Sequence, residues 1–170
     1  GATAVLVTHD QTEALSTADR VAVMRHGRIT QCASPSDVYH RPADAWTGSF
    51  VGEAVLLVGE TGDGGRVVRC ALGVLAVADG GAVPDGSTVD VFLRPEQITV
   101  GSGTGVASGV AARVVARSFE GSQVGVRLAL AGAGGEIAAR WSSTEAVPEV
   151  GDEVHVTVRG AAVVFGGGGR

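Results

Sequence analysis

The chain has 170 residues, of which 45% are hydrophobic and 18% charged, and its net charge at pH 7 is −5. This composition excludes a disordered chain, and no apolar run reaches the ~20 residues that a membrane-spanning helix requires. The negative charge, the 4% aromatic content and the absence of lysine argue against nucleic acid as a partner, because phosphate binding needs a cationic surface. Since no basic region followed by an apolar stretch opens the chain, we expect a cytosolic protein or a part of a longer one.

The first fifty residues combine strand and helix patterns. Residues 4–7, AVLV, form an apolar run that is typical of a strand buried on both faces of a parallel sheet. The following DQTEALSTA predicts a helix whose N-cap is either Thr8 or Asp10. Residues 20–31 predict a β-hairpin that turns at His26-Gly27.

Two further helices are predicted before residue 53. SPSDVYH has Ser34 in position to cap a helix and Pro35 at its first turn, where proline is favoured. Residues 43–51 predict the second helix.

From Ala54 onward almost every pattern is that of a strand. Short alternating runs are separated by glycine-rich turns, an arrangement typical of barrels and sandwiches. The predicted strands cover residues 54–60, 66–72, 74–79, 88–94, 97–100, 111–119, 123–130, 136–141, 152–159 and 161–165.

This second region also contains an internal repeat. VPDGSTVDVFLRP (residues 83–95) is echoed by VPEVGDEVHVTVRG (residues 147–160) with one inserted residue. Each copy has Val-Pro, a glycine turn and alternating apolar residues that end in arginine, and each follows a pair of predicted strands. The repeat therefore predicts two copies of one small barrel-like unit.

His9 is the first candidate for chemistry. A polar residue between a strand and a helix lies at the carboxyl edge of a parallel sheet, where such sheets bind ligands. An imidazole there has a donor and an acceptor for a terminal phosphate and its attacking water. The alternative is a histidine that caps the helix or bonds to nearby backbone, and the residue by itself favours this alternative.

The surroundings of His9 change that balance. The positions that matter are Val7-Thr8-His9-Asp10-Gln11, Glu13-Ala14, Ala18-Asp19-Arg20, Met24, Gly27, Ile29, Gln31, Pro35, Tyr39, Pro42, Phe50 and Gly52. Their spacing closely resembles the end of the nucleotide-binding subunit of ABC importers. The resemblance implies that His9 is the switch-loop histidine, a catalytic and ATP-binding residue that contacts the γ-phosphate. Cys32-Ala33 departs from the family, which usually has a glycine there, but lies away from the nucleotide.

The second region resembles another part of the same family. FLRPEQITV, FEGSQVGVRL and EVGDEVHVTV occur in the order found in the C-terminal regulatory (TOBE) domain of the iron(III), spermidine and maltose type, which consists of two oligonucleotide-binding (OB)-like barrels. The implied fold is mainly β. Residues 1–53 would be the tail of an α/β nucleotide-binding domain, and residues 54–170 a duplicated OB-like regulatory domain.

Several motifs of the family are absent from the chain. There is no GxxxxGK[ST] phosphate loop and no LSGGQ-type signature, and the acidic residues for Mg²⁺ and catalysis are expected upstream of Gly1. We therefore expect the C-terminal part of a longer subunit, called the parent below. ATP and Mg²⁺ would bind in the parent, which would be the enzyme, and this part alone would need no cofactor.

The resemblance implies a role in transport. In the parent, two subunits would drive transmembrane permease subunits from the cytoplasmic side of the cell membrane, and the region from Ala54 would hold them together as a homodimer. The stretch from residue 33 to 57 looks most like iron(III) importers, with polyamine and sugar importers left open.

The rival hypothesis is a stand-alone OB-like module that binds a small oxyanion such as molybdate. Arg94 and Glu96 are the candidates for lining such a ligand pocket, although an ion pair at the strand end is the favoured reading of these two residues. Cys32 and Cys70 are too far apart for a CxxC pair and predict reduced thiols. We expect no metal site, and we expect Trp141 and Phe119 to be core or interface anchors.

Overall fold

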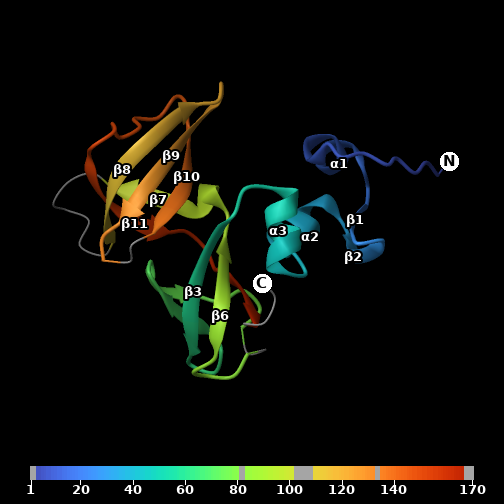
Figure 1. Ribbon diagram of the computed structural model, residues 1–170, viewed down its shortest axis with the longest axis horizontal. Helices are drawn as coiled ribbons and strands as arrows, with labels where there is room; N and C mark the ends of the chain where they lie inside the picture. Colours follow the sequence, from blue (N-terminus) through green and yellow to red (C-terminus); the bar gives the residue numbers. More distant parts are fainter. Residues whose placement is uncertain (1–2, 81–82, 102–108, 133–134, 167–170) are drawn as a thin grey trace. The chain divides into compact units, whose positions relative to one another are not determined.

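The computed structural model describes residues 3–80, 83–101, 109–132 and 135–166. The chain divides into two compact units, Gly1–Glu53 and Ala54–Arg170, which are drawn in Figure 1. Within the described ranges, no helix is both long and apolar enough to cross a membrane.

The first unit contains three helices and a hairpin in the predicted order. They are α1 (Gln11–Thr17), β1 (Val21–Arg25), β2 (Arg28–Ala33), α2 (Pro35–His40) and α3 (Ala45–Val51). The hairpin turns at His26 and Gly27, which both have positive φ angles of 49° and 75°, as a two-residue turn with the twist of the strands requires.

Side-chain caps set the helix starts. Asp10 caps α1, because its Oδ1 accepts a hydrogen bond of 3.0 Å from the Glu13 N–H. Ser34 caps α2 as predicted, with a 3.2 Å bond from the Asp37 N–H. Asp44 caps α3, so this helix begins two residues later than the predicted 43–51. An N-cap oxygen takes up one of the backbone donors that a helix start leaves unsatisfied.

The predicted strand at residues 4–7 is wrong. These residues adopt no strand, and Val5 and Val7 are 88% and 93% exposed. A strand buried on both faces needs neighbouring strands on both sides, and none of the described strands of this chain pairs with it. The core of the first unit lies instead between the hairpin and α2 and α3, where Val23, Val38 and Val51 are buried and Trp46 packs against them.

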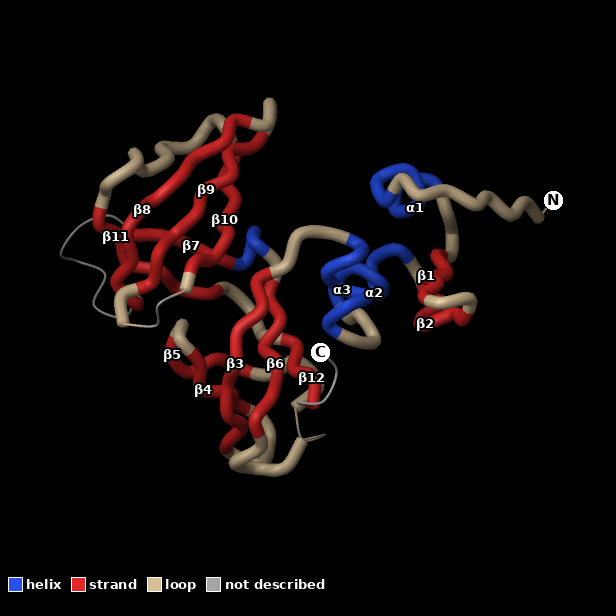
Figure 2. The backbone as a smooth tube through the Cα atoms, viewed as in Figure 1, coloured by secondary structure: helices blue, strands red, loops and turns tan. Residues whose placement is uncertain are grey.

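The second unit contains two antiparallel sheets. The first sheet has the strand order β12-β6-β3-β4-β5 and the second β10-β9-β8-β11-β7 (Figure 2). All ten predicted strands are present. They are β3 (Val55–Gly62), β4 (Val67–Cys70), β5 (Gly73–Ala76), β6 (Thr88–Leu93), β7 (Ile98–Gly101), β8 (Val110–Phe119), β9 (Gln123–Leu130), β10 (Glu136–Ser142), β11 (Glu153–Val158) and β12 (Val163–Gly166).

The two sheets are copies of each other with one strand exchanged. When the first sheet is read from β12 and the second from β7, the remaining four strands have the same arrangement: β6-β3-β4-β5 matches β11-β8-β9-β10. The strand that follows β6 in the chain, β7, pairs with β11 of the second sheet. The strand that follows β11, β12, pairs with β6 of the first sheet. Each copy of the repeat in the second unit therefore supplies the edge strand of the other copy's sheet.

Equivalent backbone hydrogen bonds confirm the duplication. In the first copy the Thr61 N–H donates to Ser87 at 3.1 Å, and the Gly86 N–H donates back to Thr61 at 2.9 Å. In the second copy Val114 takes the place of Thr61, with bonds of 3.0 Å to the Asp152 carbonyl and 2.9 Å from the Gly151 N–H. Gly86 and Gly151 both have positive φ angles, of 74° and 99°, which explains why a glycine follows Val-Pro in each repeat.

One hydrophobic core joins the two sheets. The strands alternate as the sequence predicts, with inward-facing valines and leucines from both copies in a single buried cluster. Residues with less than 3% exposure include Val68, Val89, Val91, Leu93, Ile98, Val114, Val126, Leu128, Val154 and Val156.

We predict that Gly59→Ala destabilises this core. A methyl group at Gly59 would lie 2.6 Å from Val68 Cγ2 and 2.7 Å from Val91 Cγ2, and such overpacking costs about 1–3 kcal/mol in the free energy of unfolding. Gly166→Ala is the matched control, because it lies in β12 with no atom within 4 Å of the added methyl group. Urea unfolding of the three proteins measures the difference. Equal stability of the two variants would contradict the prediction.

Candidate functional site

His9 lies on an exposed segment directly before α1. Its two neighbours hold the backbone: Thr8 Oγ1 accepts a 3.0 Å hydrogen bond from the Asp10 N–H, and Asp10 caps the helix. The capping role that the sequence left open for His9 therefore belongs to Asp10. The His9 side chain stays exposed between two residues that are engaged locally.

Gln31 organises the other end of the first unit. Its side-chain amide donates to the Arg41 carbonyl at 3.0 Å, and its carbonyl oxygen accepts from the Ala43 N–H at 2.9 Å. The hairpin is thereby tied to the link between α2 and α3. This contact explains structurally why a glutamine stands at one of the positions that carry the family resemblance.

Arg94 and Glu96, the candidate ligand residues, lie at the crossing from the first sheet to the second. Arg94 precedes a short 3-10 helix, η1 (Pro95–Gln97). Its side chain is 2% exposed, with the guanidinium carbon 4.7 Å from the centre of the Phe92 ring, whereas Glu96 is exposed. A ligand-binding role for Arg94 and Glu96 stays a prediction.

Gln97 fastens this crossing to the second one, and sequence reasoning did not single it out. Its Oε1 accepts from the Arg94 N–H at 2.9 Å, and its Nε2 donates to the carbonyls of Arg159 and Ala161 at 3.2 and 3.1 Å. The Arg159 N–H also donates to the Gln97 carbonyl at 2.8 Å. One side chain thus holds the segments before β7 and before β12 together. The available signal was a glutamine two residues after the buried stretch Leu93-Arg94-Pro95.

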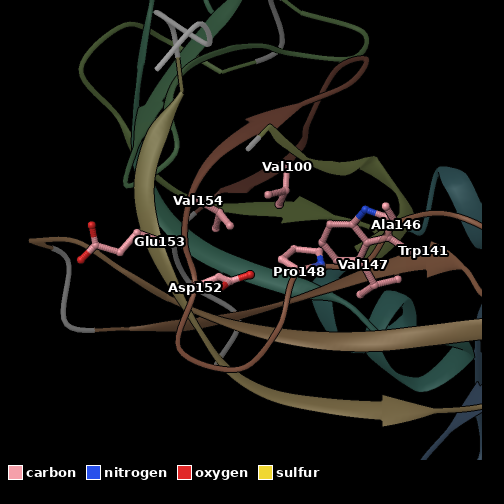
Figure 3. A pocket seen from close by; sticks show the side chains of 8 residues that line it. All are labelled: Val100, Trp141, Ala146, Val147, Pro148, Asp152, Glu153 and Val154. Atoms are coloured by element: carbon pink, nitrogen blue, oxygen red, sulfur yellow. The ribbon is translucent and has the colours of Figure 1, made fainter. Parts of the chain in front are cut away.

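A pocket of about 260 Å³ lies in the second sheet and the loop before β11 (Figure 3). We call it the Trp141 pocket. Its lining residues are Val100, Trp141, Ala146, Val147, Pro148, Asp152, Glu153 and Val154. Trp141 and Pro148 form an apolar wall, and Asp152 directs its carboxylate toward them, whereas Glu153 points away (Figure 3).

Sequence reasoning assigned Trp141 to the core or an interface and did not single out Asp152. Trp141 is half-buried and packs against the core while it also lines the pocket. A signal was present in the repeat, because the second copy has Asp152 and Glu153 where the first has Ser87 and Thr88. The two copies therefore differ in charge at these two positions, which line the pocket in the second copy.

The two cysteines have different surroundings, since Cys32 is exposed and Cys70 is partly buried. Cys32 and Cys70 are both free, and burial raises the pKa of the Cys70 thiol, an effect that a backbone hydrogen bond at Leu72 partly opposes. Cys70 is therefore a neutral thiol near pH 7 and a poor nucleophile. Among the described residues, no three His, Cys, Asp or Glu side chains are grouped to hold a metal ion.

Comparison with known families identifies the part of the second unit that contains the second sheet. Residues 91–165, from β6 to β12, match the TOBE domain. The chain contains a TOBE domain. This TOBE domain covers the crossing at Gln97, the complete second sheet and the returning strand β12.

The chain is also similar to importer ATP-binding proteins along nearly its whole length. A protein of Rhodococcus jostii named Fe(3+) ions import ATP-binding protein is 42% identical over 168 residues, which are 96% of this chain and 46% of that protein. A protein of the same name from Pseudomonas fluorescens is 39% identical over 173 residues, 98% of this chain and 46% of that protein. The chain spans about half the length of these relatives and corresponds to their C-terminal part.

A solved structure shares the fold. The cytoplasmic molybdate-binding protein ModG, solved with molybdate bound, matches with a TM-score of 0.51 over 65% of this chain and 94% of that chain. The sequences are 14% identical, so the likeness shows the fold alone. The mainly β fold with OB-like sheets, as predicted, is confirmed.

We predict that Gln97→Ala lowers stability by about 1–3 kcal/mol, since it leaves the Arg94 N–H and the carbonyls of Arg159 and Ala161 without this partner. Gln123→Ala, at an exposed strand start, is the matched control and should change stability little. Thermal unfolding followed by circular dichroism compares them. We call the hydrogen bonds of the Gln97 side chain the Gln97 clamp. A Gln97 variant as stable as the Gln123 variant would show that this clamp does not stabilise the fold.

Proposed function

We propose that the chain is the C-terminal part of the ATP-binding subunit of an ABC importer. The alignment of 96% of its residues with the Fe(3+) ions import ATP-binding protein of Rhodococcus jostii carries this proposal. The first unit would be the tail of the nucleotide-binding domain, and the TOBE domain with the rest of the second unit would be regulatory. In the parent, ATP hydrolysis on the cytoplasmic side of the membrane would drive permease subunits.

The exposed N-terminal segment supports this assignment. Val5 and Val7 are apolar residues that are almost fully exposed, as expected for a strand whose neighbours belong to another part of the parent. His9 follows this segment, and its ring is exposed beside a backbone held by Thr8 and Asp10. In the complete site His9 would orient the γ-phosphate of ATP and the attacking water.

ATP and Mg²⁺ bind in the parent in this proposal. A phosphate loop needs consecutive backbone N–H groups and a lysine, and the chain has no lysine. In this proposal His9 is one residue of the ATP site, and the rest of the parent supplies the other residues. Its part in the chemistry is to hold a proton donor or acceptor at the terminal phosphate, where hydrolysis depends on positioning and electrostatics.

Iron(III) is the proposed transported substrate. Relatives from Rhodococcus jostii, Pseudomonas fluorescens and Serratia marcescens are all named as Fe(3+) import proteins, at identities of 39–42%. Iron would cross through the permease subunits, so no residue of this chain would touch it. Uptake of radiolabelled iron by cells with and without the parent gene tests the substrate.

We further propose that the second unit holds two parents together as a homodimer. One face of the first sheet, here the outer sheet face, exposes Leu56, Val58 and Val74 by 47%, 53% and 62%. The strand registers place all three on the same side. Packing two such faces together would remove this apolar surface from water.

The oxyanion-binding module is the second candidate, favoured by the fold shared with ModG. The charges of the Trp141 pocket oppose it, because the lining residues include two carboxylates and no basic residue. Calorimetry with molybdate and sulfate tests this candidate, and tight binding would promote it over the importer proposal.

We predict that His9→Ala in the ATP-hydrolysing parent lowers the ATPase rate by about 100-fold or more, the usual loss for one transition-state hydrogen bond. ATP affinity and melting temperature should change little, because the side chain is exposed. His26→Asn is the matched control: it removes an exposed histidine from the hairpin turn and tolerates the positive φ angle. Unchanged hydrolysis in the His9 variant would overturn the proposed role.

We predict that the chain sediments as a dimer and that Val58→Glu makes it monomeric, since a charge on the outer sheet face would be desolvated on packing. Val150→Glu is the matched control, because Val150 is 59% exposed but lies in the loop before β11. Equilibrium sedimentation measures the oligomeric state of the native chain and of the two variants. Dimers of the Val58 variant, or a monomeric native chain, would exclude this face as the interface.

A further inference from the structure

We propose that the Trp141 pocket binds a small organic cation, an ammonium group on a short apolar stem. The stem would lie against the wall of Trp141 and Pro148, and the charge would lie at the Asp152 carboxylate. The proposal concerns the second unit alone and is independent of the importer function.

The charge around the pocket selects a cation. The loop from residue 142 to 153 contains Glu145, Glu149, Asp152 and Glu153 and no basic residue. The arginines that β8 provides are already engaged, because Arg113 pairs with Glu153 at 3.1 Å and Arg117 pairs with Glu149. In the described part of the chain, no basic side chain pairs with Asp152.

Asp152 is held rigidly by its backbone and by one carboxylate oxygen. Its Oδ2 accepts a 2.9 Å bond from the Glu149 N–H, and its own N–H donates to the Glu149 carbonyl at 3.1 Å. Its carbonyl accepts from the Val114 N–H at 3.0 Å. These bonds fix the carboxylate where it faces Trp141 and Pro148 (Figure 3), so Oδ1 is placed to accept a charge-assisted hydrogen bond from an ammonium group.

The apolar wall supplies the second half of the recognition. Trp141, Pro148, Val147 and Val100 present a ring face and aliphatic groups beside the carboxylate. A cation near an indole face is attracted by the negative face of the ring, and an aliphatic stem gains from leaving water. The volume of about 260 Å³ suits a ligand of a few heavy atoms and is small for a bulky metabolite.

Two sources supply this chemistry, a free amine and a lysine side chain of a peptide. Both present an ammonium group on an alkyl stem, and only the peptide carries flanking backbone. The probes are therefore n-butylammonium for the free amine and Nα-acetyl-lysine amide, with its side-chain ammonium group unmodified, for the peptide side chain. n-Butanol and butyrate are the neutral and anionic counterparts of the same stem.

Fluorescence of Trp141 measures the binding. The chain has two tryptophans, so Trp46→Phe leaves Trp141 as the sole reporter. We expect a saturable change in emission with n-butylammonium or Nα-acetyl-lysine amide. The probe that binds with the higher affinity indicates whether the ligand is a free amine or a lysine side chain. We expect no saturable change with n-butanol or butyrate. Absence of saturation with both cations, or an equal response to n-butanol, would overturn the proposal.

Substitution of Asp152 tests the site itself. Asp152→Asn keeps the shape and the acceptor for the Glu149 N–H but removes the charge, and the affinity for n-butylammonium should fall about tenfold. Glu136→Gln is the matched control, because it removes a carboxylate at the far end of β10 outside the pocket, and the affinity should stay unchanged. Equal affinity in the Asp152 and Glu136 variants would overturn the proposal.

A folding defect in the Asp152 variant would still leave a decisive measurement. On the Trp46→Phe protein with Asp152 intact, the affinity for n-butylammonium should fall as sodium chloride is raised, because salt screens the attraction to a partly exposed carboxylate. A salt-independent affinity would show that the carboxylate does not carry the binding, and would overturn the proposal.

Discussion

The exchange of β7 and β12 between the two sheets is the constraint on which the second unit depends. Each copy of the repeat ends one strand short of a complete sheet, and the chain supplies that strand from the other copy. The two sheets therefore cannot separate without losing an edge strand each. Gln97 closes the arrangement, because its side chain bonds to both crossings within a single residue. Buried residues of both sheets also share one hydrophobic core.

The same exchange explains where the candidate sites lie. The crossing from β6 to β7 carries Arg94 and Glu96 and runs over η1, which packs against β10. β10 carries Trp141, and β7 carries Val100, so a strand from the first half helps to line the Trp141 pocket in the second. The two copies share one backbone pattern, including the paired bonds at Thr61 and Val114, while only the second has Asp152 and Glu153. A duplicated scaffold thus carries a pocket whose charge only one copy provides.

The first unit presents a different balance of local and distant forces. Its helices begin at residues whose side chains cap them, and its hairpin turns where two residues accept positive φ. These are local interactions, because each cap bond joins residues three positions apart. Val5 and Val7, in contrast, need partners from further strands to be buried. The role proposed for His9 concerns this half of the chain, because His9 lies between the exposed segment and the locally capped helix α1.

The sequence by itself determined the elements whose causes are local. Alternating apolar residues predicted all ten strands of the second unit, capping residues predicted two of the three helices of the first unit, and the Val-Pro-glycine repeat predicted the duplication. It did not determine which strands pair, because β7 and β12 have the same alternation in either sheet. It also failed at residues 4–7, where an apolar run indicates burial only if neighbours exist. The Trp141 pocket and the Gln97 clamp were decided by the tertiary structure alone, since Trp141 and Asp152 are brought together by a loop, and Gln97 meets Arg159 through strand exchange. The reason is physical: caps and turns depend on residues a few positions apart, whereas pockets and strand exchange depend on contacts between distant segments that no local pattern encodes.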